Sequence, residues 1–108
     1  MLTSNTSVID RRITIAGDHQ TFPYETGWAL EGVWFVQVEG DHPELILQPQ
    51  ASPDGINWVD HGEPTTLEAD QVIGHVPVSH FGSWLRLAIS GSTRARPATI
   101  LTHLALKG

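Results

Sequence analysis

Two alternating stretches near the C-terminus decide the fold: SWLRLAIS at residues 83–90 and ATILTHLALK at residues 98–107. In the first stretch, Leu85, Leu87 and Ile89 share one side of an extended chain, because successive side chains of a β-strand project to opposite faces. The second stretch keeps the same period of two. The pattern predicts two half-buried strands joined by a polar loop at 91–97.

Working outward from this pair, the rest of the chain shows short apolar stretches separated by turn residues. Further strands are expected at 12–16, 32–39, 44–51 and 56–59, with weaker patterns at 65–73 and 76–78. The β-branched and aromatic stretch 32–39 predicts a central strand covered on both faces. Pro49 and Pro77 predict a bulge or an edge position, because proline cannot donate to a ladder.

No long window keeps a helical apolar stripe without an interrupting Gly or Pro. The sequence therefore predicts an all-β, single-domain antiparallel β-sandwich, with a jelly-roll-like arrangement or a small barrel as the alternative.

A chain of 108 residues has room for one core and little room for a deep catalytic cleft. Residues 1–10 are polar and do not alternate, which predicts an extended N-terminal arm ordered by a neighbouring molecule, followed by a sandwich domain at 11–108. The N-terminus has no basic segment before an apolar run, so no signal peptide is expected, and no apolar stretch is long enough to span a membrane.

The charges are unevenly distributed along the chain. Six Lys+Arg against twelve Asp+Glu give a net charge of -6, the opposite of the basic footprint that nucleic-acid binding requires. No Lys or Arg occurs from residue 13 to residue 85, where every acid except Asp10 lies. This distribution indicates either a polar molecule that docks by its basic end or an acidic surface that maintains solubility.

The six histidines raise the question of a metal or acid/base site. Three of them follow an aspartate, in Asp18-His19, Asp41-His42 and Asp60-His61, but all three pairs fall in expected turns, where Asp bonds its own backbone. Turn chemistry is therefore favoured over a metal or acid/base site. There is no nucleophile elbow, no phosphate loop and no cysteine, so we expect no enzymatic activity, no catalytic residue, no metal and no cofactor.

The four tryptophans are the better lead to a binding surface. Trp34 and Trp58 are expected in the core. Trp84 is phased opposite Leu85, and together with Trp28 it is a candidate platform for a partner or a sugar ring. Carbohydrate binding through an exposed tryptophan is accordingly the alternative function.

The segment SPDGINW at 52–58 predicts a tight turn and follows the order S-x-D-G-x-x-W. Calcium binding at Asp54, Asn57 and Asp60 is the weaker alternative for this loop. The segment is similar to a hairpin found in discoidin-like and carbohydrate-binding sandwiches and in small phage or prophage structural proteins.

The order of the further motifs resembles the phage group. These motifs are ITI at 13–15, GVWFVQV at 32–38, WLRL at 84–87 and the alternating stretch 100–106. Pro53 and the His-rich turns depart from that pattern.

The resemblance implies a non-enzymatic virion accessory protein, either a capsid decoration or a tail- or baseplate-associated subunit. Such a protein would form homo-oligomers and bind a protein lattice or neighbouring structural subunits, with no nucleic-acid or membrane partner. It would be made in the host cytoplasm and located in the virion. An adaptor subunit of a bacterial complex is a third possibility. The residues expected to contact a partner are Arg11, Arg12, Trp28, Trp84, Arg86, Arg94 and Arg96.

Overall fold

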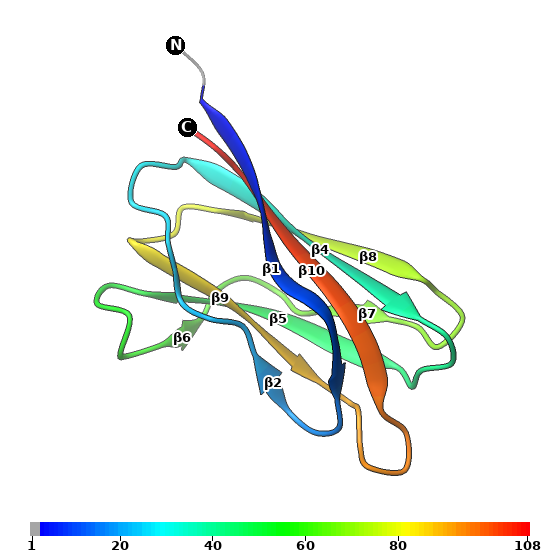
Figure 1. Cartoon of the computed structure of the whole chain (residues 1–108). Coiled ribbons are helices and arrows are strands. Elements are labelled where there is room, and N and C mark those ends of the chain that lie inside the picture. Colours follow the sequence, from blue (N-terminus) through cyan, green and yellow to red (C-terminus); the bar gives the residue numbers. More distant parts are fainter. Residues whose placement is uncertain (1–2) are drawn as a thin grey trace.

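The computed structural model describes residues 3–108 and consists of two antiparallel β-sheets packed as a sandwich, with no helix in this range (Figure 1). The predicted fold class is confirmed. Sheet A has the order β1 (Ser4–Ile15), β10 (Ala98–Lys107), β4 (Glu31–Glu39), β8 (Ile73–Ser79). Sheet B has the order β2 (His19–Gln20), β9 (Trp84–Ser90), β5 (Leu45–Ser52), β6 (Val59–Asp60), with β3 (Tyr24–Glu25) also pairing with β9 and β7 (Thr65–Leu67) with β5. In the described part of the chain there is no helix that could cross a membrane.

The core lies between the sheets and follows the predicted alternation. Leu85, Leu87 and Ile89 of β9 are buried, and the inward side chains of β10 meet them from sheet A. Trp34 of β4 is fully buried, as predicted. Its indole Nε1 is the one buried side-chain polar atom among the described residues that has no hydrogen-bond partner.

The first strand is longer than predicted. Residues 4–10 belong to β1 and pair with β10, from Ser4 opposite Lys107 to Asp10 opposite Thr102, so the predicted arm is wrong for these residues. The polar sequence misled the prediction because an edge strand can expose most of its side chains and still form a ladder. The first two residues of the predicted arm lie outside the described residues.

Strand β4 is central, as predicted, but it is not covered on both faces. Its even-numbered residues are buried, whereas Val33 and Phe35 on the other side are half-buried, because no element packs on that side within residues 3–108. Pro77 lies in the edge strand β8, as expected. Pro49 lies in β5 between the residues that pair with β7 and those that pair with β6.

The predicted turn at 52–55 is confirmed, and Asp54 organises it. The carboxylate accepts hydrogen bonds from the backbone N–H groups of Ile56 (2.9 Å) and Asn57 (2.8 Å) and from the Ser52 hydroxyl (3.0 Å). These donors hold the pKa of Asp54 well below its usual range. The loop wraps around this carboxylate, so most of the predicted strand 56–59 is not a strand. Only its last residue, Val59, together with the following Asp60, pairs with β5.

Candidate interaction surfaces

The outward side of sheet A is a partly apolar surface that no element of the described chain covers. Its outward residues alternate with the buried core residues of the same strands. We call it the sheet A face and define it by Val8, Val33, Phe35, Ile73, His75, Pro77, Leu101, His103 and Ala105. The strand register sets Val8, His103, Phe35 and His75 in one row across all four strands.

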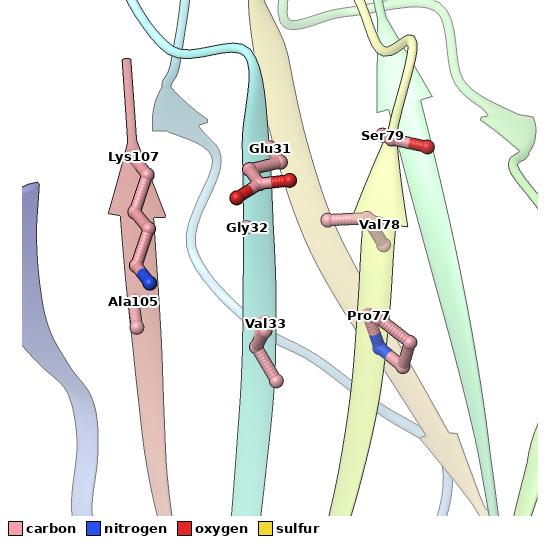
Figure 2. Close-up of a pocket in the computed structure, with 8 residues that line it drawn as sticks. All are labelled: Glu31, Gly32, Val33, Pro77, Val78, Ser79, Ala105 and Lys107. Atoms are coloured by element: carbon pink, nitrogen blue, oxygen red, sulfur yellow. The ribbon is translucent and has the colours of Figure 1, made fainter. Parts of the chain in front are cut away.

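One end of the sheet A face carries two opposite charges beside a shallow hollow. Lys107 of β10 lies directly opposite Glu31 of β4, and Figure 2 shows Lys107 above Ala105 and Glu31 above Val33, with β8 alongside. The hollow has a volume of about 370 Å³. Among the described residues, no ion pair joins Lys107 to Glu31.

Both edges of sheet A are poorly suited to pairing with another strand. Edge strand β1 has register shifts between Val8 and Ile13, and Arg12 within the shifted segment has a φ of 50°. Arg12 also pairs with Glu39 at 3.0 Å. The other edge strand, β8, contains Pro77. Bulges, arginines and prolines on edge strands are features that discourage edge-to-edge association.

The predicted contact residues do not form one basic surface. Arg11 and Arg12 lie in the β1 irregularity, toward the end of sheet A where the β9–β10 loop also lies. That loop carries Arg94 and Arg96, both exposed.

The other predicted contact residues lie elsewhere. Arg86 and Trp84 belong to β9 in sheet B, and Trp28 lies between β3 and β4, beside the C-terminal Gly108.

Arg96 and His42 join the loops at the end opposite the termini. The Arg96 guanidinium donates to the His42 carbonyl at 3.1 Å. The buried His42 ring lies 2.8 Å from the Pro43 carbonyl and 2.6 Å from the Gln71 carbonyl. Three separate loops therefore meet at His42, and Arg96 has a structural contact as well as an exposed position.

The outward side of sheet B carries a polar network under a tryptophan. The Arg86 guanidinium lies 4.3 Å from the Trp58 ring centroid and donates to Gln50 Oε1 at 2.7 Å, while Gln50 donates to Asp60 Oδ1 at 3.0 Å. Partial burial lowers the pKa of Arg86. The prediction that Trp58 belongs to the core is wrong: it is half-buried over Arg86, because the turn at 52–55 brings it over the outward side of β9.

The two candidate tryptophan platforms differ in access. The Trp84 ring packs against the turn, since a β-carbon added at Gly55 would lie 3.3 Å from a ring carbon. Trp28 is 45% exposed. Leu30, which is 75% exposed, lines a hollow of about 550 Å³ together with Thr3, Lys107 and Gly108. Trp28 is thus the more accessible of the two rings for stacking on a ligand.

The histidines of the three Asp-His pairs contact groups other than the aspartate that precedes them. His61 lies 2.6 Å from the Ser79 carbonyl. His19 contacts Asp10 at 3.1 Å rather than its neighbour Asp18. Asp10 also accepts a hydrogen bond from Thr102 at 2.9 Å. Sequence analysis missed this buried group, because the three residues are far apart in the chain. Within residues 3–108 no three potential ligands are grouped to hold a metal ion.

Comparison with known proteins identifies the family. Residues 30–105 match the model of DUF6385, a domain of unknown function. The chain belongs to the DUF6385 family. The matched segment runs from just before β4 to within β10, so it includes three of the four sheet A strands and the Ser52–Trp58 turn. A search of curated protein sequences returned no match.

Solved structures with the same fold include an exported protein and a pilus subunit. The PBSX exported protein XepA superposes with a TM-score of 0.72 at 8% identity, over 94% of this chain and 36% of XepA. The DUF6385 chain thus spans about a third of the length of XepA. A subunit of the disulfide-linked pili that form Bacillus endospore appendages superposes with a TM-score of 0.64 at 10% identity, over 97% of this chain and 87% of the subunit. PirA gives 0.52 at 12% identity, over 97% of this chain and 93% of PirA.

Proposed function

We propose that this DUF6385 domain is a non-enzymatic structural subunit that docks in a larger protein assembly, and that the assembly is a phage virion, in which the domain decorates the capsid or accompanies the tail. The observation that carries the proposal is the sheet A face: an apolar surface of four strands that no element of the described chain covers. Contiguous exposed apolar surfaces mark interaction sites in soluble proteins.

Two further observations support the proposal. The fold is shared with the exported protein XepA of PBSX and with the subunit of endospore pili, so the same sandwich occurs in an assembly-forming protein. The disulfide linkage of those pili cannot form here, since this domain contains no cysteine. Any assembly of this domain therefore uses contacts other than disulfides through this chain.

The proposal is tested by co-expressing the chain with the products of its neighbouring genes. Size-exclusion chromatography and negative-stain microscopy should show the chain bound to a larger particle. Replacing the exposed Arg94 by Glu tests whether the basic loop contributes: binding should weaken while the melting temperature stays nearly constant, because exposed charges contribute little to stability. A chain that joins no particle formed by any neighbouring product would contradict the proposal.

A further inference from the structure

We propose that the sheet A face binds a second copy of this chain, forming a two-fold dimer whose axis runs parallel to the strands, between β10 and β4. This inference rests on the proposed structural function and names one partner for its main surface. The dimer buries the apolar rows of both copies against each other and leaves sheet B and the loop ends free for other contacts.

A face-to-face contact is favoured over strand addition because both edges of sheet A carry features that discourage pairing. At one edge, β1 is shifted in register around Arg11 and Arg12. At the other, β8 carries Pro77. The central strands, by contrast, direct Val33, Phe35 and Ala105 away from the core, where they are half-buried in the single chain.

The register between β10 and β4 makes the surface complementary to itself. Outward residues lie opposite one another as Lys107 with Glu31, Ala105 with Val33, His103 with Phe35, Leu101 with Gln37, and Thr99 with Glu39. A two-fold axis parallel to the strands exchanges the β10 and β4 positions at every level. Each residue of β10 then faces, in the second copy, the residue that it already neighbours in its own sheet.

The facing pairs are chemically compatible at three of the five levels, those of Lys107, Ala105 and His103. Lys107 faces the second copy's Glu31, and this contact occurs twice by symmetry. The small Ala105 faces Val33, and the His103 ring faces Phe35, so a small side chain meets a larger one and two flat rings can stack. Aligned sheets cross at roughly 30°, and the resulting offset is largest at the ends, where Lys107 and Glu31 have the longest reach.

The other two-fold arrangement is disfavoured by charge. An axis in the same plane but perpendicular to the strands would set Glu31 against the second copy's Glu39, and Lys107 against Thr99. Glu39 is already paired with Arg12, so Glu31 gains no cation from this arrangement, and Lys107 is left without an acidic partner, which costs affinity. The axis parallel to the strands creates no like-charge pair among these positions.

The size and charge of the surface fit a reversible dimer. Nine residues of β10 are in register with β4, and four strands spaced by about 4.8 Å give roughly 500 Å² per copy, or roughly 1,000 Å² in all, near the lower limit for a specific interface. Only Glu31 and Glu39 of the acidic residues point outward from sheet A; the others lie in loops, in sheet B or, for Asp10, in the interior. Most of the acidic residues that give the chain its net charge of -6 therefore lie outside this surface.

A charge-exchange experiment tests the dimer and its axis together. Analytical ultracentrifugation of the intact chain over about a hundredfold concentration range should show a monomer–dimer equilibrium. E31K alone and K107E alone each place like charges opposite each other twice, and each should weaken dimerisation by about tenfold. Mixing E31K with K107E should restore association, because one copy then carries two positive charges and the other two negative charges at the facing positions.

Restoration on mixing cannot arise from effects within a single folded chain, which makes it the decisive result. If the mixture associates no better than either variant alone, the proposed axis is wrong. If the unmodified chain remains monomeric at every concentration, the dimer is wrong, whereas the proposed function would still be judged by co-assembly with neighbouring gene products.

Two matched alanine positions distinguish a specific effect at the sheet A face from a general effect of added surface charge. Ala105 in β10 and Ala88 in β9 are both half-buried, outward-facing residues of central strands in their sheets. A105D should weaken dimerisation by at least about tenfold, while A88D should leave it unchanged. Circular dichroism confirms that both variants are folded. Equal effects of the two variants, or no effect of A105D, would overturn the proposal.

Discussion

Replacing Asp10 by alanine is expected to remove a buried polar link between the two sheets. The carboxylate is 6% exposed, and its Oδ2 accepts hydrogen bonds from His19 Nε2 at 3.1 Å and from Thr102 Oγ1 at 2.9 Å. Asp10 and Thr102 belong to sheet A, whereas His19 belongs to β2 in sheet B. The group also lies within the β1 register shift, so it anchors the irregular segment that carries Arg11 and Arg12.

The magnitude follows from the number and burial of these bonds. A hydrogen bond to a charged group contributes about 1.5–3 kcal/mol, and breaking a buried pair costs about 3–5 kcal/mol. The His19 side chain is 21% exposed, so water compensates part of its loss. We expect D10A to lower the free energy of unfolding by about 3 kcal/mol, which corresponds to a fall in melting temperature of about 12–24 °C for a domain of this size.

The measurement is urea unfolding followed by tryptophan fluorescence, in a double-mutant cycle with T102V. The two single variants share one hydrogen bond, so their effects should be non-additive by about 1–3 kcal/mol. T99V is the control, because Thr99 lies on the same strand and bonds Thr14 at the exposed surface; it should change stability by less than about 0.5 kcal/mol. A loss below about 1 kcal/mol for D10A, or additive effects in the cycle, would refute the reasoning.

Three further predictions concern a loop, a pair of acids and the sheet B network. G91A should destabilise the fold by about 2 kcal/mol or more, measured by chemical denaturation, since Gly91 has a φ of 114° and a β-carbon there would clash with the Glu44 carbonyl oxygen; a neutral effect would contradict this. Glu44 raises the pKa of Glu68 above its usual value of 4.5 through a shared hydrogen bond and charge repulsion. The contribution of Glu68 to stability is therefore full below about pH 4 and declines as pH rises through the raised pKa. E68Q should raise the melting temperature at about pH 7 but not below about pH 4, and the same gain at both pH values would exclude this cause. W58A should cost about 1 kcal/mol in thermal unfolding by removing the ring over Arg86, and W58F should retain part of that contribution; identical losses in the two variants would argue against a cation–π contact.

Sequence analysis predicted the fold well where side chains alternate on a half-buried strand. In β9, Leu85 and Leu87 recur at every second position and lie in the core, as expected. The prediction failed for residues 4–10, because an edge strand needs no apolar alternation, and for Trp58, because a residue beside a tight turn can be placed on either side of a sheet.

The candidate surface was less predictable than the fold. Periodicity shows that Val33 and Phe35 point away from Trp34, but it does not show whether another layer covers them. The stretch 32–39 therefore predicted a strand buried on both sides, and only the arrangement of the sheets reveals its uncovered side. The basic residues all lie near one or the other end of the sequence. The fold nevertheless distributes them between the two sheets and the two ends of the sandwich.

The sequence by itself determined the long alternating strands, which of their residues enter the core, and where the Ser52–Trp58 turn reverses the chain. These properties depend on residues within a few positions of one another, so local patterns carry them. Only the tertiary structure decided which strands lie side by side. That choice sets Lys107 opposite Glu31 and joins Asp10 to both Thr102 and His19. Such contacts depend on cross-strand register, which is set by the packing of the whole core.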